Sequence, residues 1–381
     1  MGGRSFTEED LAVKFSGIED PRTDRNKKYP LYEIIFLVLC GALCDADSWR
    51  GIEILGEERL DFLRRFFPFS KGIPSHQTIG RVFSLLRPKS FEAFFQIWSS
   101  EMSGSNNGKH IAIDGKTSRG SSDKSVGKQA LHLLHAFAVE SGITLAQLEV
   151  DAKTNEIKVV PDMIDSLDVE GAMISVDALN TQKEIAEKII DAKADYTLAL
   201  KGNHKTLNEH VGEVFDFADA VEKSSEYYVE ETEKSHGRVV KRSCDIVPLE
   251  GIDLEKKADW KGLKALGRVQ TSVWKNGQES FETRYYLLSY CNVQLFAKTA
   301  RGHWAVEAMH WTLDVTFSED LSQKRKDHAP RNYSLVRKFA LNIIKKCKGK
   351  LTGPNAKLKA LCNPQFLEKM LVESGFKLAV N

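Results

Sequence analysis

Two short apolar segments of the chain are each followed directly by an aspartate. Asp114 follows residues 111–113, and Asp177 follows residues 174–176. Both runs are rich in β-branched residues, which predicts buried strands with a carboxylate at the rim of the sheet. A third acid, Glu307, lies far downstream in a segment with helical spacing. Three such acids can bridge two divalent cations about 3.5–4 Å apart, and hard cations prefer oxygen ligands. The pattern predicts a metal site for phosphodiester chemistry.

Four polar side chains share one face of the predicted Glu307 helix, because they follow the spacing i, i+4, i+7 and i+11. They are His303, Glu307, His310 and Asp314. Either histidine is expected to steer a phosphate or a water beside the metals. Asp314 is the main alternative to Glu307 as the third ligand, since it lies two turns along the same face. The tryptophans at 304 and 311 lie on other faces and are expected in the core.

A basic segment is hidden within the overall net charge of +1. Residues 321–360 contain twelve Lys or Arg and one acid, a net charge of +11. Positive charge at this density indicates a polyanion partner, although apolar residues at helical spacing also allow a folded helix with one solvated basic face. We expect DNA contacts from Lys324, Arg325, Lys326, Arg331, Arg337 and Lys338, and from Lys116 and Arg119 in a hydroxyl-rich loop at 116–122.

Membrane and secretory classes find no support in the sequence. There is no run of eighteen or more apolar residues, and no hydrophobic region follows the basic N-terminus. The six cysteines contain no CxxC pair, which suits a reducing compartment. We therefore expect no membrane association and a cytoplasmic location.

The two ends of the chain differ from its middle. Helical apolar spacing predicts an all-helical N-terminal domain over residues 5–102. The small polar residues at 103–108 predict a flexible linker. We expect a C-terminal tail over residues 351–381.

Strand patterns begin at residue 109 and predict the first part of a catalytic core over 109–206. A meander of three strands is followed by helices and strands in alternation, which is the order of a ribonuclease-H-like fold. In that fold the ends of the first and fourth strands lie side by side, and the two aspartates fall on those strands. The five strands are expected at 110–114, 131–139, 144–150, 172–177 and 196–200.

Residues 207–300 predict a β-rich insertion, and residues 301–350 predict the Glu307 helix with the basic C-terminal part of the core. The predicted fold class is therefore mixed, combining α+β and α/β features. It consists of a ribonuclease-H-like catalytic core with a β-rich insertion, preceded by an all-helical N-terminal domain.

Several short phrases, in this order, carry a resemblance to a known family. The chain resembles the H-repeat-associated insertion-sequence transposases, from about residue 15 to residue 345. These belong to the wider DDE cut-and-paste transposases, whose catalytic core is ribonuclease-H-like. The phrases are Asp-Pro-Arg at 20–22, Tyr-Pro-Leu at 29–31, Gly-Ile-Pro-Ser at 72–75, Ile-Ala-Ile-Asp-Gly-Lys at 111–116, Leu-Lys-Gly-Asn at 200–203 and His-Trp-Ala-Val-Glu at 303–307.

The resemblance implies roles for individual residues. Asp114, Asp177 and Glu307 would be the catalytic, metal-binding triad. Many relatives in the wider group place an arginine four residues before this glutamate and a lysine seven after it. Here His303 and Asp314 stand at those places, and Arg301 is expected to supply the missing cation. The auxiliary site residues are therefore expected to be His303, Arg301, His310, Asp314, Lys201 and Asn203.

The resemblance also implies an activity and its partners. We expect a transposase that uses two Mg²⁺ ions, for which Mn²⁺ can substitute, to hydrolyse DNA at the element's terminal inverted repeats and to join the 3′ end to target DNA by transesterification. The helical N-terminal domain would bind or pair the ends, with a homodimer on double-stranded DNA at the bacterial nucleoid. The alternatives are a metal-dependent nuclease without strand transfer and a non-catalytic DNA-binding derivative.

Overall fold

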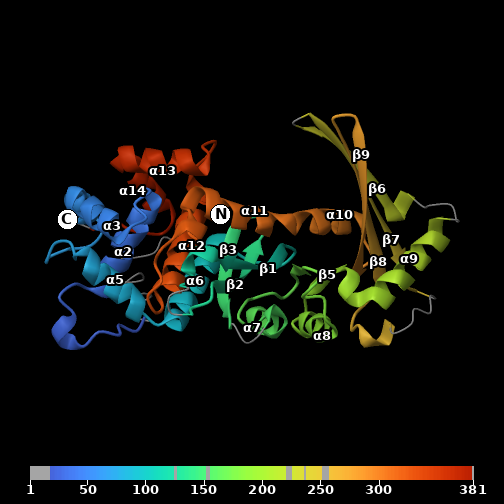
Figure 1. The fold of residues 1–381 in the computed structure, drawn as a ribbon, viewed down its shortest axis with the longest axis horizontal. Helices are drawn as coiled ribbons and strands as arrows, with labels where there is room; N and C mark the ends of the chain where they lie inside the picture. The colour runs from blue at the N-terminus through green and yellow to red at the C-terminus, as the bar shows by residue number, and fades with distance from the viewer. Residues whose placement is uncertain are drawn as a thin grey trace.

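The structure is a computed structural model that describes residues 18–123, 127–151, 155–219, 225–235, 237–250 and 257–379. Positions 5–17 of the expected helical domain and 380–381 of the expected tail lie outside these residues. The described chain is a mixed α/β protein with one large mixed sheet and an N-terminal helical region (Figure 1). No helix in this part of the chain is long and apolar enough to cross a membrane.

The N-terminal helices share one hydrophobic core with the helices at the C-terminal end of the chain (Figure 1). Phe339 lies at its centre, with its ring centroid 4.6 Å from that of Phe95 and 4.7 Å from that of Trp98. Residues 353–373, within the expected tail, are therefore packed helices. The helices of this core are α2 (Leu31–Leu43), α3 (Trp49–Glu58), α4 (Leu60–Leu63), α5 (His76–Leu85), α6 (Pro88–Ser103), α11 (Trp304–Phe317), α12 (Ala329–Cys347), α13 (Gly353–Cys362) and α14 (Pro364–Glu373).

The segment 103–108, predicted as a flexible linker, is anchored instead. Asn106 is buried, and its Nδ2 donates to the carbonyl oxygen of Asp168 at 2.9 Å. The backbone N–H of Gly108 donates to the carbonyl oxygen of Gly171, also at 2.9 Å. Small polar residues form such side-chain and backbone bonds as readily as they form free linkers, so composition alone could not distinguish the two.

In the described part of the chain, nine strands form one sheet in the order β3-β2-β1-β4-β5-β9-β8-β7-β6. The β1–β4 and β4–β5 pairs are parallel, and the other pairs are antiparallel. The strands after β5 extend the same sheet, because β9 pairs with β5. The strands are β1 (His110–Ser118), β2 (Leu131–Ala138), β3 (Ile143–Val150), β4 (Met173–Val176), β5 (Asp195–Leu200), β6 (Tyr228–Ser235), β7 (Arg238–Pro248), β8 (Ala265–Lys275) and β9 (Gln278–Leu288).

Strand β1 is longer than predicted, and Asp114 lies in its middle. Its antiparallel partner β2 pairs along the whole length, as far as Ser118 opposite Leu131. Its parallel partner β4 stops earlier, at the pair formed by Ile113 and Val176. The expected loop at 116–122 is therefore strand as far as Ser118, followed by the short helix η2 (Arg119–Ser121).

Helices cover the sheet around β1 on both faces. Ile111 and Ile113 pack into a core with α7 (Val160–Asp165) and α8 (Lys183–Asp191), which lie below the sheet in Figure 1. Ala112 packs into the other core, with α11 (Trp304–Phe317). Because strand side chains alternate between faces, Asp114 lies on the α11 face with Ala112.

The helix that carries Glu307 begins after a break. The helix α10 (Val293–Gly302) ends at Gly302, and α11 starts two residues later at Trp304. A Cβ at Gly302 would lie 2.7 Å from Nδ1 of His110 in β1. Glycine at this position therefore allows the junction of the two helices to approach the sheet beside the strands that carry the aspartates. The remaining helix of this region is α9 (Lys205–Asp219), which follows β5.

Candidate active site

The register of β1 and β4 brings Asp114 and Asp177 together. The parallel pairing ends at Ile113 opposite Val176. Each aspartate is the residue that directly follows the last paired residue of its strand. Ser175 and Asp177 lie two residues apart, as Ala112 and Asp114 do, and this spacing places both carboxylates on the α11 face. Each side chain is half-buried. The strand pattern of the sequence predicts this arrangement, because it puts an aspartate directly after each of two neighbouring strands.

A cavity of about 840 Å³ opens beside these carboxylates. Glu307 reaches it from the first turn of α11 and is exposed there. Asp314 does not line it. The sequence-predicted residues that line this cavity are Asp114, Asp177, Glu307, His303, Lys201 and Asn203.

The electrostatics of the cavity favour a bound cation. Burial, together with the charges of Asp177, Glu156 and Glu307, raises the pKa of Asp114 to about 7. Burial and the charge of Glu156 also raise the pKa of Asp177. A divalent cation would relieve this repulsion, so the donor set fits a metal of the oxygen-preferring class. In the described part of the chain, no group of three or more His, Cys, Asp or Glu side chains is close enough to form a ready-made metal site.

A pair of buried histidines supports Asp114. His310 Nδ1 lies 3.5 Å from Oδ2 of Asp114, and its Nε2 lies 2.9 Å from Nδ1 of His135. Burial lowers the pKa of His310 to about 3 and that of His135 well below its usual value, so both rings are neutral. Both contacts are satisfied when His135 donates to His310 and His310 directs its Nδ1–H toward Asp114. His310 is thus placed to orient that carboxylate.

His303 contacts the sheet rather than an acid. The hydroxyl of Ser175 lies 2.8 Å from Nδ1 of His303 and 2.6 Å from Nε2 of His110. Burial lowers the pKa of His303 to about 4, so its ring is neutral at the edge of the cavity. The hydroxyl bridges β4 to the start of α11 and fixes the end of the helix that presents Glu307.

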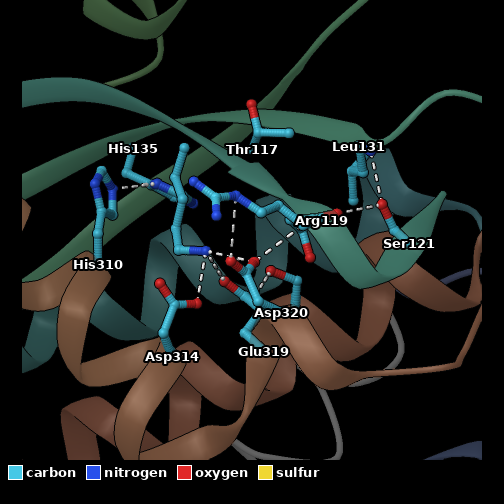
Figure 2. Close-up of polar contacts among 12 residues, drawn as sticks. Thr117, Arg119, Ser121, Leu131, His135, His310, Asp314, Glu319 and Asp320 are labelled. Atoms are coloured by element: carbon cyan, nitrogen blue, oxygen red, sulfur yellow. Dashed lines mark hydrogen bonds and ion pairs between the residues drawn. The ribbon is translucent and has the colours of Figure 1, made fainter.

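Lys116 and Asp314 lie in a separate charged cluster between β1 and the C-terminal half of α11. Figure 2 shows Asp314, Glu319 and Asp320 converging on one point. Lys116 Nζ lies there, 2.8 Å from Asp314, 3.1 Å from Asp320 and 3.6 Å from Glu319. Asp314 is therefore the partner of a buried lysine, and Lys116 has no surface from which to contact DNA.

Arg301 and Asn203 also have defined partners. The guanidinium of Arg301 pairs with Glu231 at 3.2 Å and with Glu233, both on β6. It does not line the cavity, so it does not supply a cation beside the acids. Asn203 lines the cavity, and its Nδ2 donates to the carbonyl oxygen of Ala178 at 2.7 Å, next to Asp177.

Most of the cations expected to contact DNA lie inside the protein, which corrects that expectation. Lys324 and Arg337 pair with Asp47 at 3.4 and 2.9 Å, and Arg331 pairs with Glu92 at 2.7 Å. Since α12 runs through the helical core, its cations are enclosed and need acidic partners. The cations with little exposure are Lys116, Lys324, Arg331, Arg337 and Lys338, whereas Arg119, Arg325 and Lys326 are exposed.

The sequence did not predict that Trp304 lines the cavity or that a fourth acid lies near the aspartates. Trp304 and Trp311, expected in the core, are 42% and 64% exposed, because α11 packs through Val306, Met309 and Leu313. Arg284 and Arg242 lie over the Trp304 ring, 5.1 and 5.8 Å from its centroid. The fourth acid, Glu156, lies beside the two aspartates. No local motif in the sequence signalled either feature.

Asp114→Asn is expected to stabilise the cation-free protein at high pH. The folded-state pKa of about 7 exceeds the 3.8 that is usual for an aspartate, so the folded state binds more protons than the unfolded state between these values. The free energy of unfolding should therefore fall by roughly 2–4 kcal/mol as pH rises through this window. Asparagine does not ionise and avoids that loss.

Urea unfolding of both proteins in EDTA, at about pH 5 and about pH 8, measures this difference. The advantage of Asp114→Asn should be larger at the higher pH. If the stability advantage of Asp114→Asn over the wild type became smaller as the pH rises, the ionised Asp114 carboxylate would not be the cause of the lost stability.

Two family models match the chain. Residues 12–99 match the model described as DDE_Tnp_1-associated, and residues 106–343 match the transposase DDE domain. The site and these matches indicate an enzyme of the DDE type. The chain belongs to the transposase DDE domain family.

Relatives match along nearly the whole chain. The chain is 37% identical over 374 residues to the putative transposase YncI of Escherichia coli O157:H7, with 95% of each protein covered. It is 36% identical over 375 residues to the H repeat-associated putative transposase YhhI of Escherichia coli strain K12, covering 96% of this chain and 98% of that one. The resemblance to H-repeat-associated transposases is confirmed, as is the expected function of an insertion-sequence transposase.

Solved structures of other proteins also align with the chain. One of them is a cryo-EM structure of the piggyBac transposase synaptic complex with hairpin DNA, with a TM-score of 0.40 and 10% identity, covering 94% of this chain and 77% of that chain.

Proposed function

We propose that this transposase cuts DNA at the ends of its own element with divalent cations held by Asp114, Asp177 and Glu307, and joins the 3′ end to target DNA. The observation that carries the proposal is that these acids, from three separate segments, line one cavity. Two Mg²⁺ ions, or Mn²⁺ in their place, suit carboxylate oxygens. When bound, such ions activate a water or a 3′-hydroxyl and stabilise the leaving oxygen.

A ribonuclease-H-like core is part of the same proposal. The order β3-β2-β1-β4-β5, with β2 antiparallel to β1 and β4 parallel to it, supports this assignment. In this arrangement β1 and β4 are adjacent, and the two acids stand where their pairing ends. The strands from β6 to β9 then form an extension of the core rather than a separate sheet.

Neighbouring groups of the protein orient the acids. His310 orients Asp114, and the backbone N–H of Asn180 donates to Oδ1 of Asp177 at 2.9 Å. Glu307 is exposed on the cavity side, so its carboxylate has room to adjust when a substrate phosphate enters. Lys201, also exposed at the cavity, is placed to contact that phosphate.

Double-stranded DNA is the proposed partner, both as element ends and as target. We assign phosphate contacts to the exposed cations Arg119, Arg325 and Lys326, and most of the affinity should therefore fall steeply with salt. Transposition joins two ends of one element to one target, so a homodimer on DNA is the proposed active form, with the helical N-terminal region helping to bind or pair the ends.

A joining assay tests this function. A labelled duplex from the element's end, with a free 3′-hydroxyl, should become joined to a target plasmid in Mg²⁺ or Mn²⁺ and stay unjoined in EDTA. The matched control is the same duplex ending in a 3′-deoxynucleotide, which should give no joined product. Cleavage without joining would point to a nuclease, and DNA binding without either reaction would point to a non-catalytic derivative. Each of these two results would overturn the proposal.

A further inference from the structure

Gly115, directly after the first aspartate, is enclosed by another acid. A Cβ built at this position would lie 2.1 Å from Oε1 of Glu156 and 2.9 Å from Nε2 of His132. The Glu156 carboxylate occupies that space, so any side chain at this position would have to displace it. Glu156 stands at the start of the short helix η4 (Glu156–Lys158), which follows β3. The close contact places a fourth carboxylate against the backbone beside Asp114.

The Glu156 carboxylate is held from two sides. Its Oε1 lies 2.6 Å from Nε2 of His132, and its Oε2 accepts a hydrogen bond from Nδ2 of Asn180 at 2.7 Å. The same Nδ2 donates to Oδ1 of Asp177 at 2.9 Å. One buried amide therefore connects Glu156 to Asp177. Because this amide donates to both carboxylates, its orientation is fixed, and Oδ1 of Asn180 is left buried without a hydrogen-bond partner.

Glu156 also acts through its charge. Burial opposes its ionisation, but hydrogen bonds from His132 and Asn180 outweigh burial and keep its pKa below the usual value. The carboxylate is therefore a fixed negative charge, and it contributes to the raised pKa values of Asp114 and Asp177. Repulsion of this kind disfavours the empty site and is relieved when a cation binds. Glu156 is thus joined to Asp177 through Asn180, and its charge acts on both aspartates.

We propose that Glu156 is a positioning residue of the metal-binding carboxylates, which orients Asp177 through Asn180 and strengthens cation binding by its charge. The inference rests on the proposed function, because it concerns the same site. It adds to the site a residue, Glu156, that lies outside β1, β4 and α11. The inference also explains why a glycine follows Asp114, because Gly115 leaves room for the Glu156 carboxylate.

Glu156→Gln separates charge from geometry. Glutamine can still accept from Asn180 and, through its amide, can donate to His132, so the fold is expected to survive with an unchanged melting temperature. Cation affinity should fall about tenfold, at the lower end of the 10–100-fold range for groups that orient metal ligands. The readout is Mn²⁺ titration of the DNA-free protein, followed by electron paramagnetic resonance at about pH 8. The matched control is Glu170→Gln, an exposed acid paired with Lys193 at 3.1 Å, which should bind Mn²⁺ as the wild type does.

Gly115→Ala provides a second route that removes no charge. The added methyl group must displace Glu156, so Mn²⁺ affinity should fall in this variant also. Wild-type affinity in folded Glu156→Gln, or in folded Gly115→Ala, would overturn the inference. Asp177→Asn keeps this result distinct from failure of the proposed function. If Asp177→Asn loses Mn²⁺ binding while Glu156→Gln retains it, only the role of Glu156 fails. If Asp177→Asn itself binds Mn²⁺ normally, the proposed metal site fails with it.

Discussion

Asp177→Asn is expected to lower cleavage at the element's ends by about a thousandfold or more. The substitution keeps the size of the side chain and can retain contacts to Asn180, but it removes one of the two adjacent carboxylates that are proposed to bind metal. A metal ion that stabilises transition-state charge contributes several kcal/mol, and about 4 kcal/mol corresponds to a thousandfold in rate. The measurement is single-turnover cleavage of a labelled end duplex in Mg²⁺.

Two controls make this result interpretable. Asp162→Asn, at an exposed acid in α7, should cleave at the wild-type rate. Asp177→Asn should still bind the end duplex, because the exposed cations are unchanged, and fluorescence anisotropy measures this. Cleavage within threefold of wild type by folded Asp177→Asn would remove this residue from the catalytic assignment.

The same assay separates the two alternatives for the third acid. Glu307→Gln should lose cleavage to a similar extent, because Glu307 lines the cavity. Asp314→Asn should lose much less, since Asp314 pairs with Lys116 outside the cavity. If the larger loss came from Asp314→Asn, the two assignments would have to be exchanged.

The convergence of Asp114 and Asp177 was accessible to sequence reasoning because it depends on local pattern. Short apolar runs identify buried strands, and strand order determines which ends are neighbours. The extension of β1 past Asp114 was not accessible, because it depends on β2, whose pairing with residues 115–118 is a long-range contact. Glu156 was missed for a similar reason. Nothing near it in the chain marks it as a partner of the aspartates, and its contacts come from β2 and from the residues after β4.

The basic segment shows where composition misleads. Its charge density was read as a DNA-binding face, but α12 is surrounded by α2, α5, α6 and the C-terminal helices. Lys338 and Arg337 face inward and meet acids that lie elsewhere in the chain, such as Glu319 and Asp47. Sequence gives the number of cations on a helix, whereas their burial is decided by every element that packs around it.

Glu319→Gln is expected to destabilise the protein by about 3–5 kcal/mol. Glu319 and Lys338 are both fully buried, 3.5 Å apart, and the Glu319 carboxylate also accepts from Ser334 at 2.6 Å. Removing one member of a buried ion pair leaves the other charge without compensation, and this accounts for the loss. The free energy of unfolding, from urea titration at about pH 7, is the measurement.

Lowering the pH should also reduce the free energy of unfolding of the wild type, because it protonates Glu319. Burial opposes the charge of Glu319, but attraction to Lys338, Arg337 and Lys116 outweighs it and lowers the pKa to about 2. Since this value lies below the usual 4.5, the pair's contribution is complete above about pH 4.5 and is lost as the pH falls toward 2. Glu319→Gln should therefore lose less stability than the wild type across that acidic range.

The double variant Glu319→Leu with Lys338→Met tests the physical reason. Both charges are removed, and apolar side chains of similar size replace them, so most of the lost stability should return. Lys116 keeps Asp314 and Asp320 as partners in this background, so no lysine is left alone. If Glu319→Gln lies within 1 kcal/mol of wild type, or if the double variant is less stable than the single one, then the uncompensated charge of Lys338 is not the source of the lost stability.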